Sequence, residues 1–270
     1  MYKGGTSLDL GLKGKLALIS GSTAGIGYAI AEALVKEGAK VVVNGRTTES
    51  VDAAVAKLNR IAADSALPFT ADLSTPEAAE KVARQFPDVE IVVNNLGIFE
   101  PQAFEDITDE EWIRFFNINV LSGIRLARLY LPAMKKNNWG RIIFISSESG
   151  VQIPPEMIHY GVTKTAQLAV SRGLAEALAG TGITVNCVLP GPTRSRGVEE
   201  FVTALGKREG KTFAQFETEF FQKVRPTSLI KRFAKPEEVA SLVAYVASPL
   251  SSATTGAALR VDGGVVKSAV

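Results

Sequence analysis

The sequence predicts an α/β fold in which a doubly wound parallel sheet lies between two layers of helices. Two observations indicate this class. Short runs that are apolar throughout, typical of strands buried on both faces, alternate along the chain with segments of helical periodicity. A glycine-rich turn also joins the first apolar run to the first helical segment, as in sheets that bind ligands beyond the carboxyl ends of their strands. With 270 residues and no repeat or linker, the chain 1–270 is expected to form a single domain.

The first half of the chain alternates strands and helices in a regular order. Apolar runs predict strands at 15–20, 40–44, 66–71 and 89–95. Helical segments are expected at 25–38, from the second strand to about residue 62, and after the third strand. The first of these ends at Gly38, a residue type common at helix ends. The last opens at Ser74 or Thr75, because such residues cap helices and Pro76 suits a first turn.

The second half continues the pattern and adds one long interruption. Helices are expected at 109–136 (one or two), 156–179 and 236–247, and strands at 140–147, 182–190 and 257–261. Residues 193–235 break the pattern, since they are charged and rich in phenylalanine: Phe201, Phe213, Phe216, Phe220 and Phe221. A long insertion at the carboxyl edge of a sheet is often a lid, so residues 193–235 are predicted to cover a site. Two short surface helices are the alternative.

Composition disfavours several classes of function. The chain is 46% hydrophobic and 21% charged, its formal net charge is +2, and no long like-charged block indicates a nucleic-acid surface. It lacks the apolar core of a signal peptide and any run near the ~20 apolar residues of a membrane span. The one cysteine, Cys187, excludes an intrachain disulfide and favours a reducing compartment. We therefore expect a cytoplasmic protein without a nucleic-acid partner, a membrane partner or a metal.

The glycine-rich turn "SGSTAGIG" at residues 20–27 is the first candidate binding site. Gly21, Gly25 and Gly27 would permit a tight turn, a close approach of backbone to a pyrophosphate, and packing of the helix on the sheet. The helix N-terminus would offer free N–H groups to the phosphates, and Ser22 and Thr23 are expected to add hydroxyl donors. A glycine-rich turn without a ligand is the alternative.

The end of the second predicted strand bears on the choice of cofactor. An acidic residue there would bond a ribose 2′-hydroxyl and repel a 2′-phosphate, but Asn44 and Gly45 occupy the place and Arg46 follows. A guanidinium pairs well with phosphate. NADP(H) is therefore favoured, NAD(H) stays possible, and a solvated arginine is the alternative for Arg46.

This loop and a series of further motifs resemble those of the short-chain dehydrogenases/reductases, over residues 12–264 of this chain. The motifs besides the loop are "ADL" (71–73), "NNLG" (94–97), "NVLSG" (119–123), "ISS" (145–147), "YGVTK" (160–164), "PGPT" (190–193) and "VDGG" (261–264). Each is weak alone, but they occur in the family's order and on the expected elements. The resemblance implies a Rossmann fold and hydride transfer between a nicotinamide and a carbonyl or alcohol.

The resemblance implies catalytic roles for four residues. Tyr160 would donate a proton in reduction and accept one in oxidation; its ordinary pKa is ~10, and Lys164, one helical turn on, is expected to favour the phenolate. Ser147 would polarise the substrate carbonyl, and Asn119 would hold a helix distortion and a water that links Lys164 to solvent. The predicted cofactor contacts are Gly21, Ser22, Thr23, Gly25, Ile26, Gly27, Asn44, Arg46, Asp72, Leu73, Asn95, Gly97, Tyr160, Lys164, Pro190, Gly191 and Thr193.

Three residues near these motifs need separate expectations. Leu96 stands where the family usually has alanine, and is expected to pack near the cofactor. Glu148 directly follows Ser147 and either touches the substrate or faces solvent. His159 is expected to face a subunit contact or a loop, because adjacent helical residues point about 100° apart.

The substrate and the assembly are left open by the sequence. The default is a ketoreductase of small ketones, aldehydes or 3-oxoacyl thioesters, and the basic residues of 193–235 leave an anionic substrate open beside a solvated lid surface. A lyase or a cofactor-sensing relative on the same fold is the alternative, which Gly25, Gly27 and Lys164 disfavour. Members of the family often pair through helices, here about 103–135 and 156–179, so we expect a homotetramer or a homodimer.

Overall fold

The computed structural model describes residues 8–194 and 212–269, and it confirms the predicted fold class. Within these ranges, seven strands form one parallel sheet in the order β3-β2-β1-β4-β5-β6-β7. They are β1 (Leu16–Ile19), β2 (Lys40–Gly45), β3 (Ala66–Thr70), β4 (Ile91–Asn94), β5 (Gly140–Ile145), β6 (Ile183–Pro190) and β7 (Ala258–Val261). The order reverses direction between β1 and β4, which opens a crevice at their carboxyl ends.

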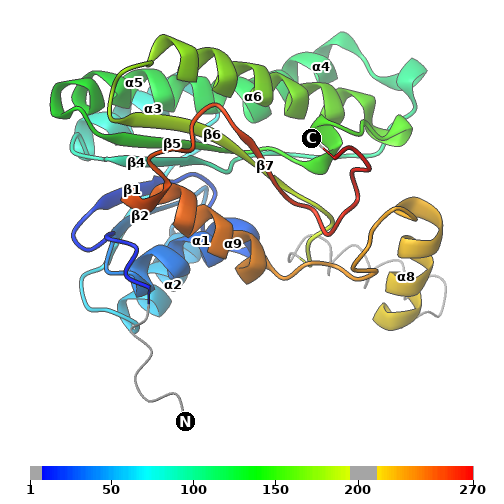
Figure 1. Ribbon diagram of the computed structural model, residues 1–270, viewed down its shortest axis with the longest axis horizontal. Helices are drawn as coiled ribbons and strands as arrows, with labels where there is room; N and C mark the ends of the chain where they lie inside the picture. Colours follow the sequence, from blue (N-terminus) through cyan, green and yellow to red (C-terminus); the bar gives the residue numbers. More distant parts are fainter. Residues whose placement is uncertain (1–7, 195–211, 270) are drawn as a thin grey trace.

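Helices cover both faces of the sheet (Figure 1). One face carries α1 (Gly25–Lys36), α2 (Thr48–Asn59) and α9 (Pro236–Ala247), and the other carries α3 (Pro76–Gln85), α4 (Asp109–Phe116), α5 (Ser122–Asn137) and α6 (Ile158–Ala177). To one side of these layers lies α8 (Phe213–Glu219). The remaining helical turns are η1 (Phe104–Asp106), η2 (Asn117–Leu121), η3 (Glu148–Gly150), η4 (Pro155–Met157), η5 (Phe220–Val224) and η6 (Pro249–Ser251).

The sheet separates two apolar cores. Side chains alternate along each strand, so Leu18 of β1 lies in one core and its neighbour Ile19 lies in the other. The core around Ile19 includes Leu34 of α1 and Val243 of α9, whereas the core around Leu18 includes Leu126 of α5. Burial on both faces explains why the strands are apolar throughout.

The predicted element boundaries are largely confirmed. Thr75 caps α3, because its hydroxyl accepts a hydrogen bond from Ala78 N at 3.3 Å, and Pro76 occupies the first turn. The segment predicted as one or two helices at 109–136 forms two, α4 and α5, which the π-helical turn η2 separates. None of the helices in the described ranges is long and apolar enough to cross a bilayer.

The predicted lid at 193–235 is described in part. Residues 212–235 contain α8 and η5, and Phe201 lies outside the described residues. The aromatic rings of this part gather on Phe233, whose ring centroid lies 5.0 Å from that of Phe220 and 5.1 Å from that of Phe221. This packing accounts for the phenylalanines of residues 212–235.

Candidate active site

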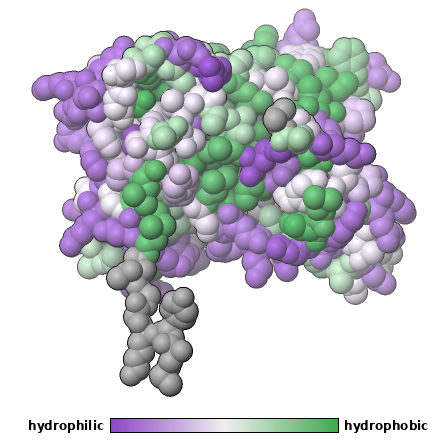
Figure 2. All heavy atoms as spheres, viewed as in Figure 1, coloured by the Kyte–Doolittle hydropathy of each residue, from purple (hydrophilic) through white to green (hydrophobic). Residues whose placement is uncertain are grey.

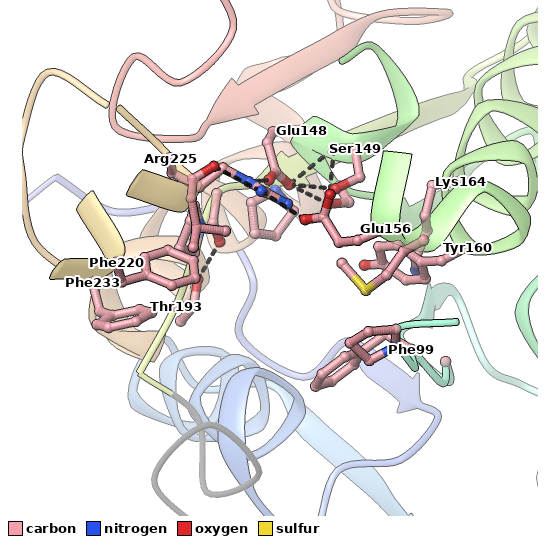
Figure 3. Close-up of a pocket in the computed structure, with 18 of the residues that line it drawn as sticks. Phe99, Glu148, Ser149, Glu156, Tyr160, Lys164, Thr193, Phe220, Arg225 and Phe233 are labelled. Atoms are coloured by element: carbon pink, nitrogen blue, oxygen red, sulfur yellow. Dashed lines mark hydrogen bonds and ion pairs between the residues drawn. The ribbon is translucent and has the colours of Figure 1, made fainter. Parts of the chain in front are cut away.

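A cavity of about 750 Å³ lies at the carboxyl edge of the sheet (Figure 3). Its lining includes residues that follow β4, β5 and β6, residues of α6, and residues of the segment 212–235. The predicted site residues in this lining are Ile26, Asn95, Gly97, Ser147, Tyr160, Lys164, Pro190, Gly191 and Thr193. The structure therefore brings together three of the four predicted catalytic residues and part of the predicted cofactor set.

The glycine-rich turn packs so closely that its glycines are required. Gly21 and Gly25 have φ angles of 63° and 57°, a region that favours glycine. A Cβ at Gly27 would lie 2.4 Å from the Gly21 carbonyl oxygen and 2.6 Å from Asn95 Nδ2. The N-terminus of α1 thus reaches the turn only because residue 27 has no side chain, as the predicted packing role of this glycine requires.

Two buried polar residues predicted to contact the cofactor instead form hydrogen bonds with backbone atoms in and beside the turn. Ser22 is buried and donates its one hydroxyl proton to Ile19 O at 2.8 Å, so the expectation that it offers a hydroxyl donor to phosphate is wrong. Asn44 is also buried; its Oδ1 accepts from Gly21 N at 3.1 Å, and its Nδ2 donates to Ala71 O at 3.0 Å. Asn44 therefore ties the turn to the end of β3.

Arg46 lies just beyond β2, close to the turn. A Cβ at Gly45 would lie 2.5 Å from Thr23 Cγ2, so a glycine at residue 45 lets the strand end and the turn approach each other. Arg46 is exposed, and within the described residues it makes no ion pair. Asp72 is exposed beyond β3 and accepts a hydrogen bond from Ser74 N, while Leu73 is fully buried in the core.

Lys164 is held in a buried position below the cavity. Its Nζ donates to Ile145 O at 2.9 Å and lies 5.6 Å from the ring centroid of Tyr160. Burial lowers the pKa of Lys164 to about 8. A Cβ at Gly97 would lie 3.4 Å from this nitrogen, so the glycine keeps space open beside the ammonium.

The pKa of Tyr160 depends on burial and on several neighbouring groups. Burial raises the pKa of this phenol above its ordinary value and the Glu148 carboxylate raises it further, while the neighbouring Ser147 hydroxyl and the Arg225 guanidinium act in the opposite direction. The expected effect of Lys164 on the phenol stays a prediction.

Asn119 lies in the π-helical turn η2, which confirms the predicted helix distortion. Its Nδ2 donates to Ile98 O at 3.0 Å and to Thr163 Oγ1 at 2.9 Å, so it joins η2 to α6. The sequence reasoning missed Gln167, whose buried Nε2 donates to Asn119 O at 2.5 Å and whose Oε1 accepts from Lys164 Nζ at 3.5 Å. Its position three residues after Lys164 on one helix was the signal that could have indicated it.

Glu148 neither faces solvent nor stands unpaired in the site. Its Oε1 accepts from Arg225 Nε at 3.1 Å, and its Oε2 accepts from Ser147 Oγ at 2.5 Å (Figure 3). Arg225 also pairs with Glu156, Nη1 to Oε1 at 3.1 Å. The sequence contains no local signal for this network, because Glu148 and Arg225 are 77 positions apart.

The expected positions of His159 and Leu96 have different outcomes. His159 is fully buried, with its ring centroid 3.9 Å from that of Phe115 and 6.1 Å from that of Trp112, so the expectation of a subunit contact or loop is wrong. Burial among these rings of α4 lowers its pKa. Leu96 lies beside the turn, since its Cδ1 would be 3.5 Å from a Cβ at Gly21.

The doubly wound sheet, the tight turn before α1, and the Ser147, Tyr160 and Lys164 side chains at one cavity form the arrangement that the family resemblance led us to expect. A family model described as enoyl-(acyl carrier protein) reductase matches residues 21–266. The oxidoreductase YvaG of Bacillus subtilis is 48% identical over 262 residues, which are 97% of this chain and 99% of that protein. The chain therefore belongs to the short-chain dehydrogenase/reductase family.

Two further relatives have named activities. D-beta-hydroxybutyrate dehydrogenase of Rhizobium meliloti is 34% identical over 255 residues, which are 93% of this chain and 98% of that protein. The crystal structure of L-sorbose reductase from Gluconobacter frateurii, complexed with NADPH and L-sorbose, matches with a TM-score of 0.92 at 32% identity. That match covers 97% of this chain and 100% of the reductase.

Proposed function

We propose that this protein is an NADP(H)-dependent oxidoreductase that transfers a hydride between the nicotinamide and a small carbonyl or alcohol substrate. The observation that carries the proposal is that Ser147, Tyr160 and Lys164 line one cavity. This cavity lies next to the glycine-rich turn, whose backbone a pyrophosphate could approach closely. The bound nicotinamide supplies the hydride. The residues present fit such a group, because Gly97 leaves room beside Lys164 and the close approach of α1 to the turn brings free N–H groups toward a pyrophosphate.

The protein's own residues would manage the proton. In reduction, the Tyr160 phenol gives its proton to the carbonyl oxygen as the carbonyl carbon gains the hydride, and in alcohol oxidation the phenolate takes it back. Ser147 contacts the same oxygen. Lys164 would bond the nicotinamide ribose, and Asn119 and Gln167 hold its surroundings in place.

The preference for NADP(H) is the finer part of the proposal. It is supported by Arg46, an exposed cation beside the turn, and by the absence of an acid at Asn44 and Gly45. The L-sorbose reductase crystal, which contains NADPH, supports it by analogy. The residues proposed to hold the cofactor are Gly21, Thr23, Gly25, Ile26, Gly27, Arg46, Asp72, Leu73, Asn95, Gly97, Tyr160, Lys164, Pro190, Gly191 and Thr193.

A screen of NADPH oxidation tests the proposal. The panel should hold simple ketones and aldehydes, ketoses, 3-oxo acids, 3-oxoacyl thioesters and quinones, with NADH run in parallel. We expect turnover with at least one carbonyl class, and loss of that turnover in Tyr160→Phe while NADPH still binds. No turnover with any class, or turnover that Tyr160→Phe leaves intact, would contradict the proposal.

We further propose that residues 212–235, the described part of the predicted lid, cover the cavity that they line.

We also propose that the protein forms a homotetramer. Large apolar side chains of the described residues are exposed at the helices expected to pair, namely Ile113, Phe116 and Leu121. Apolar side chains also gather in the middle of the face shown in Figure 2. Light scattering at micromolar concentration measures the assembly, and a monomer would contradict it.

A further inference from the structure

We propose that Glu148 and Arg225 are positioning residues of the catalytic site, which orient the Ser147 hydroxyl and set the charge beside Tyr160. The inference rests on the proposed function. It concerns residues outside the predicted catalytic set, and one of the two comes from the segment 212–235.

The pair is buried where an isolated charge would be costly. Only 6% of the Glu148 side chain and 11% of the Arg225 side chain are exposed. Both carboxylate oxygens of Glu148 are occupied: Oε1 by Arg225 Nε, and Oε2 by Ser147 Oγ, Ser149 N at 2.9 Å and Ser149 Oγ at 3.2 Å. Removing Arg225 leaves the Glu148 carboxylate buried without its counter-ion, whereas removing Glu148 leaves Arg225 paired with Glu156 alone.

The Ser147 hydroxyl has its single proton committed to this carboxylate. Ser147 Oγ donates to Glu148 Oε2 and accepts from Ser149 N at 3.1 Å, which leaves one lone pair. With that lone pair Ser147 can accept a hydrogen bond from a substrate alcohol, but it can donate to a carbonyl only by leaving Glu148. Arg225 offsets the negative charge of the Glu148 carboxylate. The carboxylate therefore binds the Ser147 proton less strongly, and a substrate carbonyl oxygen can compete for that proton.

The two members of this pair shift the pKa of Tyr160 in opposite directions. The charged side chains of the described residues that line the cavity together with Tyr160 are Glu148 on η3, Glu156 on η4, Lys164 on α6, Glu219 on α8, Lys223 on η5 and Arg225 directly after η5. The Glu148 carboxylate raises the pKa of Tyr160 and the Arg225 guanidinium lowers it. Loss of Glu148 removes a cause that raises this pKa and loss of Arg225 removes a cause that lowers it, so the two losses have opposite consequences.

The test is the pH dependence of kcat/KM for alcohol oxidation with saturating NADP⁺. Oxidation needs the phenolate, so the rate rises with pH through the Tyr160 pKa. Glu148→Gln removes a negative charge, lowers that pKa and should move the rising limb to lower pH by about one unit. Arg225→Gln leaves Glu148 uncompensated and should move the limb to higher pH by a similar amount.

Two controls separate this role from general damage. Arg232 pairs with Glu238 at 2.8 Å on the exterior of the same segment, so Arg232→Gln removes a cation there and should leave the limb in place. Arg225→Lys keeps the charge and should return the limb toward the wild-type pH. If Arg225→Gln does not fold, as circular dichroism would show, the shift of Glu148→Gln to lower pH still decides, because Arg232→Gln and Arg225→Lys should both keep the limb near the wild-type pH.

The outcomes are distinct from failure of the proposed function. That function fails if the wild-type protein has no turnover that Tyr160→Phe abolishes. The inference fails if the wild type is active but the rising limbs of Glu148→Gln and Arg225→Gln shift in the same direction. It also fails if these limbs shift no further than the limb of Arg232→Gln. Opposite shifts of Glu148→Gln and Arg225→Gln support it.

Discussion

The substitution Gly27→Ala tests whether the glycine-rich turn needs a residue without a side chain at position 27. A Cβ there would lie 2.4 Å from the Gly21 carbonyl oxygen and 2.6 Å from Asn95 Nδ2. Neither neighbour can rotate away, since the first is backbone and the second donates to the carbonyls of Ser20 and Gly21 at 3.0 Å each. We expect Gly27→Ala to lower the free energy of unfolding by about 1–3 kcal/mol, as overpacking does. The displaced α1 should also lose a phosphate contact, which weakens NADPH binding about tenfold or more.

Gly173→Ala is the matched control for this prediction. Gly173 is exposed within α6, and apart from its own helical neighbours no atom lies within 4 Å of where its Cβ would be. Alanine forms helix better than glycine by about 1 kcal/mol, so this variant should equal or exceed the wild type in stability and bind NADPH equally well. Denaturant unfolding followed by circular dichroism, and titration of NADPH fluorescence, measure the two quantities. Wild-type NADPH affinity in Gly27→Ala would refute the reasoning.

Four further substitutions follow from the site. Tyr160→Phe should bind NADPH normally while turnover falls by about 10²–10⁴, the usual contribution of proton transfer, as steady-state kinetics and titration would show. Arg46→Ala should weaken NADPH binding about tenfold and leave NADH almost unchanged; equal losses would indicate a structural role instead. Lys164→Ala should weaken binding of both cofactors by a similar factor, since the contact expected of it is to a ribose common to both. Gln167→Leu removes the hydrogen bond to Asn119 O and should cost about 1–3 kcal/mol in denaturant unfolding, with a fall in kcat; an unchanged kcat would argue against a role beside Lys164.

The fold could be predicted because its determinants are local. Buried parallel strands are apolar on both faces, and Leu18 and Ile19 show the reason, since neighbouring residues enter different cores. The cap at Thr75 and the proline after it are likewise local signals. The π-helical turn was expected only from the family resemblance, because no residue pattern in 117–121 requires it.

The candidate site could be predicted only in part. Tyr160 and Lys164 are one helical turn apart, so their juxtaposition follows from helix geometry. The inward orientation of Ser22 could not be predicted, because it depends on the Ile19 carbonyl and on the backbone of Asn44, to which Ser22 Oγ is bonded at 2.8 and 2.9 Å. His159 is buried by α4, a helix that begins 50 residues earlier, and adjacency to Tyr160 carried no information about that contact.

The buried pair of Glu148 and Arg225 links the two parts of the site. Ser147 follows β5 and Tyr160 lies on α6, so the groups that would transfer the proton stand on the rigid sheet and the helix that packs against it. The cation that balances Glu148 comes from the segment 212–235, which also supplies aromatic walls of the cavity through Phe216, Phe220 and Phe233. A substitution in that segment therefore changes more than the shape offered to substrate, because any shift of Arg225 also changes the charge felt by Ser147 and Tyr160. For this reason, variants of the segment should be assayed for their pH profile as well as for their substrate preference.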